Sequence, residues 1–336
     1  MIFRKIRHRL GRYPAIRTLA LRTLHRRAYR EDVRRRLTPQ RRLSYFILNI
    51  LDHCNLGCAG CDHFAPLAER RCVPVEDIAR DLARIAEILR GDVASIGVMG
   101  GEPLLHPRLE EILARTRRFL PETDIMLVTN GILLPKMGES FWRACRENDI
   151  VIVNTRYPIN LDYGAIRQTA AAHGVRFRHY GRTDAVIKTS YRMALDLRGT
   201  QDPRQSFRNC FHANTYPLLA QGRLYACTVA PNVRHFNRRF GTGMRLEEGD
   251  WLDIHRPVTA AGILEFLSEP RPFCRYCRVS RRSYGHPWRR SSGDFHEWVE
   301  PPRRLFGFPR TGSDTAAGIR PRRNPDGACR KDSSRV

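Results

Sequence analysis

Long apolar runs are scarce in this sequence, and so are acidic residues near its ends. No apolar run in the 336 residues approaches the ~20 residues that a membrane-spanning helix needs. The Arg-rich start also lacks the long apolar stretch of a secretory signal. These absences argue against a membrane-spanning or secreted protein and predict a cytoplasmic one.

The shortage of acidic residues is confined to the two ends of the chain. The whole sequence holds 59 Lys and Arg residues against 34 Asp and Glu, a formal net charge of +25. Residues 1–42 contain 15 basic and two acidic residues, residues 270–336 contain 16 basic and six acidic ones, and the stretch between them is nearly neutral. Basic ends suit contact with RNA, an anionic lipid surface or an acidic partner. They also fit solvated, Arg-rich flanks, which is the interpretation we favour.

Apolar periodicity predicts alternating strands and helices between residues 43 and 205. The expected strands lie at 45–51, 93–99, 124–128, 150–153, 175–180 and, as a sixth, 191–197. The expected helices lie at 75–90, 107–120, 135–148 and 161–173. Strands alternating with helices predict an α/β fold with a parallel sheet and right-handed crossovers, open or curled toward a barrel.

The pattern changes after residue 205. Residues 216–220 and 223–226 flank Gln221-Gly222 in the manner of a tight β-hairpin, and one short helix is expected at about 258–268. Arg, Pro, Gly and Ser dominate the end of the chain, which predicts disorder. We therefore expect four parts: a basic helical segment (1–42), a core domain (43–205), a cysteine-rich extension (206–285) and a basic, disordered tail (286–336).

Seven of the ten cysteines fall into two sets with metal-ligand spacing. The first set, Cys54, Cys58 and Cys61, brings three thiolates into eight residues. Soft thiolates select iron–sulfur clusters or zinc. A closed site needs a fourth ligand, which His53 or His63 could supply. With three ligands only, a cubane cluster keeps one iron open to another molecule.

Polar residues follow each of the next three predicted strands. They are Gly100-Gly101-Glu102-Pro103, then Thr129-Asn130, then Asn154-Thr155-Arg156. Because the carboxyl ends of parallel strands meet at one mouth, we expect these residues to face the first cysteine set. Ordinary turn chemistry explains Thr129, Asn130 and Arg156 about as well.

The first cysteine set resembles the signature of the radical S-adenosylmethionine (radical SAM) superfamily, C-x3-C-x2-C after the first barrel strand. The preceding strand 46–50 and the opening Cys54-Asn55-Leu56 fit the same pattern. The resemblance implies a partial (βα)6 TIM-like barrel and a [4Fe-4S] cluster held by three cysteines, with SAM on its open iron. One position departs from the family, which usually has an aromatic residue where this chain has Gly60. Phe64 is then a candidate for the contact with adenine.

The same resemblance implies the SAM contacts. Gly100, Gly101, Glu102 and Pro103 match the family segment that contacts the amino group of SAM. Thr129 and Asn130 become candidates for its ribose or carboxylate, and Arg156 becomes a candidate for its carboxylate.

The second cysteine set consists of Cys210, Cys227, Cys274 and Cys277. The spacing of Cys210, Gly222 and Cys227 resembles the opening of the SPASM extension found in some radical SAM enzymes. The further cysteines of that extension do not follow Cys277, so the resemblance is to a truncated, twitch-like type with one auxiliary [4Fe-4S] cluster. The same four thiolates would also make a structural zinc site.

The resemblance implies an enzyme that reductively cleaves SAM to a 5′-deoxyadenosyl radical. It would take electrons one at a time from a reductant such as a flavodoxin or ferredoxin, and it would oxidise or rearrange a sugar-like or peptide substrate. The alternative is a non-enzymatic zinc or iron–sulfur protein that binds nucleic acid through its basic ends. The near-neutral middle and the converging loops favour the enzyme.

Overall fold

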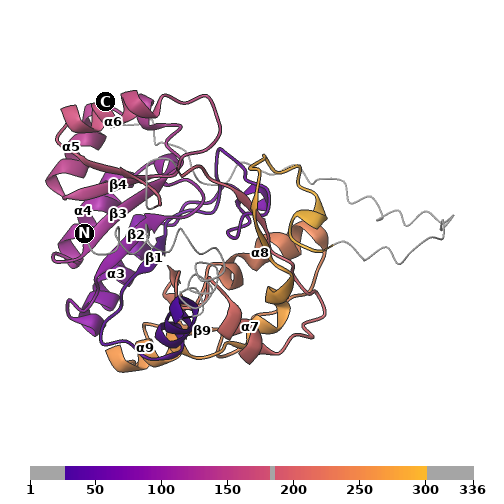
Figure 1. Cartoon of the computed structure of the whole chain (residues 1–336). Helices are drawn as coiled ribbons and strands as arrows, with labels where there is room; N and C mark the ends of the chain where they lie inside the picture. The colour runs from indigo at the N-terminus through magenta and orange to yellow at the C-terminus, as the bar shows by residue number, and fades with distance from the viewer. Residues whose placement is uncertain (1–26, 182–185, 301–336) are drawn as a thin grey trace, which may run out of the picture.

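A central sheet of eight strands organises the computed structural model, which describes residues 27–181 and 186–300. The strand order is β5-β4-β3-β2-β1-β7-β8-β9. Figure 1 labels β1 to β4, which lie side by side in this sheet. Neighbours from β5 to β1 are all parallel. These five strands are β1 (Phe46–Asn49), β2 (Ser95–Met99), β3 (Asp124–Thr129), β4 (Ile150–Asn154) and β5 (Arg176–His179). The predicted α/β fold, with the parallel-rich sheet of a partial barrel, is confirmed.

Four helices cover one face of the parallel strands, as Figure 1 shows. They are α3 (Val75–Leu89), α4 (Leu109–Phe119), α5 (Glu139–Glu147) and α6 (Tyr163–Ala172). Alternate apolar strand residues, among them Ile96, Val98 and Ile125, are fully buried in the core cluster that these helices share. The period of two along each strand therefore sends one set of side chains to the helices and leaves the other set facing the candidate site.

The sheet grows beyond β1 through a hairpin. Strand β7 (Leu218–Ala220) pairs parallel with β1, and β8 (Arg223–Tyr225) and β9 (Trp251–Asp253) follow antiparallel. The turn residues Gln221 and Gly222 both have positive φ angles, 53° and 72°. A two-residue turn with positive φ at both positions has a backbone twist that matches that of the two strands it joins. The predicted β-hairpin is therefore confirmed.

The predicted sixth barrel strand at 191–197 is wrong. Strand β6 (Ser190–Arg192) pairs antiparallel with β10 (Ser283–His286) in a separate two-stranded sheet and does not join β5. The strand has only three residues, and none of them is fully buried. It therefore lacks the apolar faces that a strand inside a helix-covered sheet needs.

Three further helices support the second half of the chain. They are α7 (Pro203–Asn209), α8 (Val229–Phe240) and α9 (Ala260–Ser268), of which only α9 matches a predicted element. A second apolar cluster includes Ile47, Leu218, Phe236 and Trp298 and joins residues on both sides of position 205. Short 3-10 helices lie at Ala65–Leu67, Pro103–Leu105, Leu134–Lys136, Pro272–Tyr276, Val279–Arg281 and Phe295–Glu297.

The predicted disorder of the tail is wrong for residues 286–300. Trp298 is fully buried in the second apolar cluster, and Glu297 is 4% exposed. These two anchors hold an Arg- and Ser-rich segment that composition alone marks as unfolded. The remainder of the predicted tail, 301–336, lies outside the described residues.

The described part of the N-terminal segment is helical from residue 27 to 37 and packs on the fold. Buried Arg36 donates from its guanidinium to the carbonyl oxygens of Cys210 (2.8 Å) and Arg208 (3.1 Å). The predicted contact of the basic ends with an anionic surface stays a prediction. Over residues 27–181 and 186–300, no helix is both long and apolar enough to cross a bilayer.

Candidate functional site

The loops after β1 and β2 are locked together at the carboxyl ends of their strands. Backbone N–H groups of Gly101 and Glu102 donate to the carbonyl oxygens of Leu51 (3.1 Å) and His53 (3.0 Å). A Cβ atom at Gly100 or Gly101 would overlap those same two carbonyl oxygens. Both glycines are therefore required by the close approach of the cysteine loop, a role that the sequence pattern did not indicate.

Glu102 then fixes the loop after β3. Its buried carboxylate accepts hydrogen bonds from the Thr129 hydroxyl (2.6 Å), the Asn130 N–H (2.9 Å) and the Leu104 N–H (3.2 Å). Burial raises the pKa of Glu102 to about 7, although the three hydrogen bonds favour its charged form. The Thr129 hydroxyl also accepts from the Gly131 N–H, so it is engaged within the protein. The roles of Glu102 and Thr129 toward SAM stay predictions.

Asn130 connects the loop after β3 to the cysteine loop. Its side-chain Nδ2 donates to Asn55 Oδ1 at 2.8 Å and lies 3.8 Å from the sulfur of Cys54. On the next strand end, the half-buried Arg156 stacks its guanidinium on the Tyr163 ring, 5.2 Å from the ring centroid. The structure thus brings Cys54, Glu102 and Asn130 into one contact network, with Arg156 at the following strand end.

The three cysteines of the first set are partly exposed as residues, and they lie close enough for a charge on one thiol to raise the pKa of another. Burial raises the pKa of Cys54 to about 11, and a charge on Cys58 would raise it further. The pKa of Cys61 is also raised, first by burial and then by charges on Asp62 and Cys58. In the described parts of the chain, no three Cys, His, Asp or Glu side chains are gathered around one point tightly enough to hold a metal ion.

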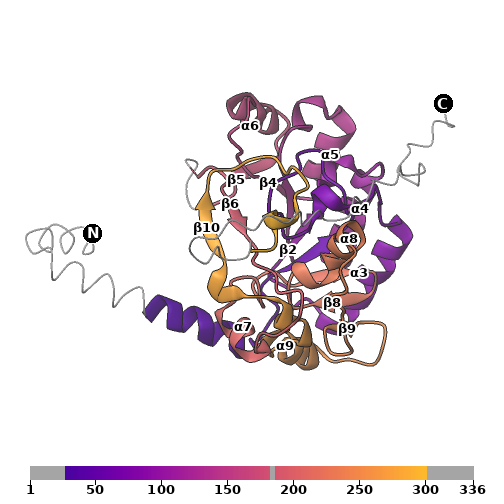
Figure 2. The ribbon, with the colours of Figure 1, turned by 90° about the vertical axis from the view of Figure 1, so that its right-hand side faces the viewer.

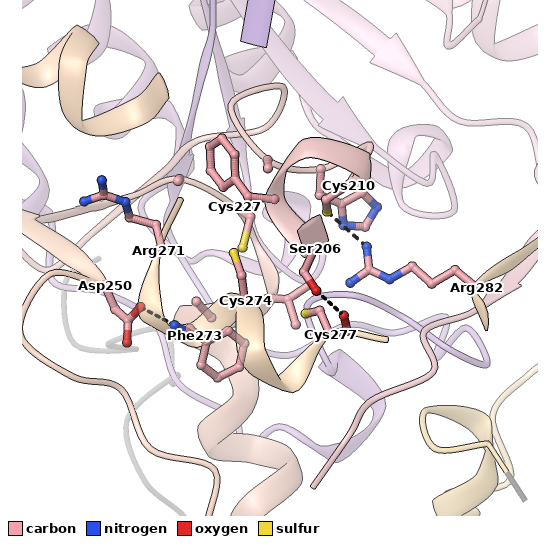
Figure 3. A pocket seen from close by; sticks show the side chains of 15 residues that line it. Ser206, Cys210, Cys227, Asp250, Arg271, Phe273, Cys274, Cys277 and Arg282 are labelled. Atoms are coloured by element: carbon pink, nitrogen blue, oxygen red, sulfur yellow. Dashed lines mark hydrogen bonds between the residues drawn. The ribbon is translucent and has the colours of Figure 1, made fainter. Parts of the chain in front are cut away.

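The four cysteines of the second set line one enclosed pocket (Figure 3). They come from the end of α7 (Cys210), the residues after β8 (Cys227) and the 3-10 helix Pro272–Tyr276 (Cys274, with Cys277 directly after it). The sulfur atoms of Cys227 and Cys274 point toward one another in Figure 3. The structure thus brings together four residues that the sequence separates by up to 67 positions.

A buried guanidinium faces these thiols. Arg282 donates from Nη1 to the sulfur of Cys210 (3.2 Å) and from Nε to the carbonyl oxygen of Met193 (3.1 Å). Its Nη2 is buried without a hydrogen-bond partner. Burial raises the pKa of Cys277 to about 11 and of Cys227 to about 12, and Arg282 opposes that rise at Cys277. A positive charge fixed beside four thiols favours an anionic metal–thiolate site.

One hydrogen bond joins the two cysteine sets. The Thr228 hydroxyl donates to Asp62 Oδ2 at 2.6 Å, and these residues directly follow Cys227 and Cys61. Burial would raise the pKa of Asp62, but the charges of His63 and His212 and the Thr228 hydrogen bond lower it. No spacing rule points to this link, because its two residues are 166 positions apart.

Two aromatic residues beside Cys58 were also missed. The Trp288 indole donates to the sulfur of Cys58 at 3.2 Å, and the ring of Tyr157 lies 5.5 Å from the Trp288 ring. Phe64, by contrast, is fully buried and packs on Phe236 and Trp298. Phe64 is therefore a core residue, and its candidate contact with adenine stays a prediction.

Part of this chain is similar in sequence to known proteins. Residues 48–193 match the model of the Radical SAM superfamily. The GTP 3′,8-cyclase of Pelotomaculum thermopropionicum is 35% identical over 111 residues, which are 32% of this chain and 33% of that protein. The GTP 3′,8-cyclase 2 of Mycobacterium tuberculosis (strain H37Rv) is 39% identical over 101 residues, 29% of this chain and 27% of that protein. The chain thus spans between a quarter and a third of the length of these relatives.

Two solved structures resemble the fold of this chain only weakly. BtrN in complex with AdoMet and 2-DOIA is 15% identical, with a TM-score of 0.42 over 70% of this chain and 93% of that chain. Streptococcus suis SuiB bound to S-adenosylmethionine is 17% identical, with a TM-score of 0.33 over 42% of this chain and 35% of that chain. At these scores, neither structure carries an argument about the chemistry of this chain.

Proposed function

Because the chain belongs to the radical SAM superfamily, we propose that Cys54, Cys58 and Cys61 hold its [4Fe-4S] cluster and that SAM binds beside them. When bound, that cluster supplies one electron, which breaks a C–S bond of SAM and releases a 5′-deoxyadenosyl radical. Family membership makes this chain an enzyme, so the non-enzymatic alternative is not retained. The protein's own residues bind and orient the reactants and keep water away.

One observation carries this proposal: the loops after β1, β2 and β3 interlock at a single mouth. Glu102 ties the loop after β3 to the loop after β2, and Asn130 ties it to the cysteine loop. Three cysteines in one loop at this mouth fit a cluster that keeps one iron open. A charge on one of these thiols raises the pKa of another, which also fits three ligands of one shared cluster.

The remaining SAM contacts follow from the same mouth. Gly100, Gly101, Glu102 and Pro103 would face the amino group of SAM, and Asn130 and Thr129 its ribose or carboxylate. Arg156, on the next strand end, would pair with the carboxylate. Glu102 acts in this arrangement chiefly by fixing the positions of the neighbouring loops.

The second cysteine set we assign to an auxiliary [4Fe-4S] cluster in a SPASM- or twitch-like extension, residues 206–285, attached to the core domain 43–205. The enclosed set of four cysteines and the buried Arg282 support this assignment. Such a cluster would accept an electron from a substrate radical, which suits oxidation. The alternative occupant is structural zinc.

The substrate would rest on a group of exposed aromatic residues, of which Phe211 directly follows Cys210 and Tyr180 contacts Tyr216. Tyr180, Phe211 and Tyr284 are 43%, 48% and 53% exposed, and Phe211 contacts both Tyr216 and Tyr284. Exposed apolar groups gathered in one place mark a binding surface. Aromatic faces accept the apolar face of a sugar-like ring or the side chains of a peptide, and we propose a substrate of one of these classes, to be oxidised or rearranged.

A one-electron reductant such as a flavodoxin or ferredoxin would supply the electrons. We place the protein in the cytoplasm, because free thiols of the kind that hold clusters persist in reducing compartments.

The deciding experiment uses anaerobically reconstituted protein. Reduced protein incubated with SAM should release 5′-deoxyadenosine, measured by liquid chromatography and mass spectrometry, and should contain iron and sulfide. The control omits the reductant and should release none. Protein that binds zinc alone and releases no 5′-deoxyadenosine would refute the proposal.

A further inference from the structure

Residues 286–300, which we call the C-terminal strap, pair with the first cysteine loop. The Ser291 N–H donates to the Gly57 carbonyl (2.8 Å), and the Ala59 N–H donates to the Arg289 carbonyl (3.1 Å). Cys58 lies between these bonds and forms an antiparallel bridge with Arg290. Figure 2 shows the strap, at the yellow end of the colour bar, running on from β10. The cysteine loop is thus held on one side by β-type pairing with a segment about 230 residues away.

The strap is itself firmly anchored. The buried Glu297 carboxylate accepts hydrogen bonds from the Ser292 N–H (2.9 Å) and from the Arg289 guanidinium (2.7 Å). The fully buried Trp298 donates from its indole to the Cys61 carbonyl at 2.9 Å. The Arg289 guanidinium bond to Glu297 and the backbone bonds of Arg289 and Ser291 to the cysteine loop therefore fix the part of the strap that directly follows Trp288.

Trp288 uses this fixed position to contact a thiol directly. Its indole N–H donates to the sulfur of Cys58 at 3.2 Å, and its ring lies edge-on against Tyr157. An N–H group that points at a thiolate stabilises negative charge on the sulfur. Hydrogen bonds to the sulfurs are one of the means by which a protein sets the reduction potential of an iron–sulfur cluster.

We propose that Trp288 is a positioning residue that raises the reduction potential of the first cluster by hydrogen bonding to the Cys58 sulfur. The inference rests on the proposed function, since it needs Cys58 to be a cluster ligand. The added electron makes the cluster more negative, and the indole N–H stabilises this reduced form more than the oxidised one. The strap holds the donor at the required distance.

The test compares Trp288→Phe with the wild type in a redox titration followed by electron paramagnetic resonance. The first cluster is identified as the one whose signal changes when SAM is added. Phe keeps an aromatic ring but removes the N–H, so the midpoint should become more negative. At a fixed potential, the ratio of reduced to oxidised cluster should fall about tenfold, which corresponds to about 59 mV for one electron. Iron content should stay at the wild-type level.

Trp251→Phe is the matched control, because it removes an indole from β9, where the ring lies against the Arg223 guanidinium and not against a cysteine of the first set. Its midpoint should equal that of the wild type. An unchanged midpoint in Trp288→Phe, with the iron retained, would overturn the inference while leaving the proposed function intact. Failure of the proposed function looks different, because the wild type would then bind no SAM-responsive cluster.

A second variant covers the case in which Trp288→Phe loses the first cluster. Trp288→His restores a ring N–H at this position. Retention of the cluster by Trp288→His alone would support the hydrogen-bonding role. Loss of the cluster from both variants would overturn it, because bulk rather than the N–H would then be the requirement.

Discussion

The two cysteine sets differ in how the chain encloses them. The first set lies in one loop of eight residues, with all three cysteines partly exposed at the carboxyl ends of the strands. The second set is assembled from three segments around a pocket that also contains the buried Arg282. A set with three ligands in one loop is suited to bind a further molecule, whereas a set of four ligands that line one pocket is suited to structure or electron transfer.

The largest expected effect comes from removing the first set, which tests whether the two sets have different roles. Changing Cys54, Cys58 and Cys61 together to Ala should abolish 5′-deoxyadenosine formation and lower the iron content by about four atoms per chain. The second set should keep its metal, because its ligands come from other segments. Iron analysis and mass spectrometry measure both results.

Cys145→Ala provides the control for this triple variant. Cys145 is fully buried in the helix-covered core and belongs to neither set. This variant should lose some stability but keep SAM cleavage. Continued SAM cleavage by the triple variant would contradict the assignment of the first set.

Removing one ligand of the second set should have a smaller and different effect. Cys274→Ala should lose the auxiliary metal while the first cluster remains, so slow SAM cleavage without substrate should continue. Conversion of the true substrate should stop or stall. Loss of about four iron atoms per chain would identify a cubane. Loss of zinc at constant iron would instead identify a structural zinc site and remove the proposed electron acceptor.

Much of the parallel sheet could be predicted because its information is local. Residues 46–49, 95–99 and 150–154 are apolar runs bounded by breakers, and Gln221-Gly222 specifies its hairpin by backbone conformation. The neighbour with which a strand pairs depends on contacts between distant segments, which the local sequence does not show. Strand β7 pairs with β1, some 170 residues earlier, and β6 pairs with β10, so the sixth strand was misplaced.

The candidate site divides in the same way. Cysteine spacing singled out both cysteine sets from the sequence, and their role as metal ligands stays a prediction. The Thr228–Asp62 and Trp288–Cys58 contacts are not visible, because each joins segments more than 160 residues apart. The strap was also missed because its Arg- and Ser-rich composition outweighed the two residues that anchor it, Glu297 and Trp298.

Arg282 allows a finer test of the second set. A buried guanidinium costs desolvation energy when the neighbouring thiols are protonated, and it is compensated when they become a metal–thiolate anion. Arg282→Met should therefore leave the melting temperature of the metal-free protein unchanged or raise it. It should also reduce, by several degrees, the stabilisation that metal loading produces.

Arg278→Met is the control for this measurement, because the Arg278 side chain is 37% exposed and lies 3.8 Å from Asp196. Its loading effect should match the wild type. Equal melting shifts in Arg282→Met and the wild type would show that Arg282 does not compensate the charge of the bound metal site.

The smallest predicted effect concerns Glu102, which connects the loops of the first site without being a ligand. Its pKa of about 7 in the folded protein lies above the ordinary 4.5, so between these values the folded state binds more protons than the unfolded state. The contribution of this group to the free energy of unfolding is therefore fully present below about pH 4.5 and is lost as the pH rises through 7. The loss amounts to about 3 kcal/mol. Glu102→Gln cannot ionise, so its stability deficit relative to the wild type should shrink between pH 5 and pH 8 in urea unfolding. Glu87→Gln, whose side chain is 71% exposed on α3, should show a deficit that does not change with pH in this way. A Glu102→Gln deficit that stays constant or grows with pH would mean that the hydrogen bonds from Thr129, Asn130 and Leu104 keep Glu102 ionised despite its burial.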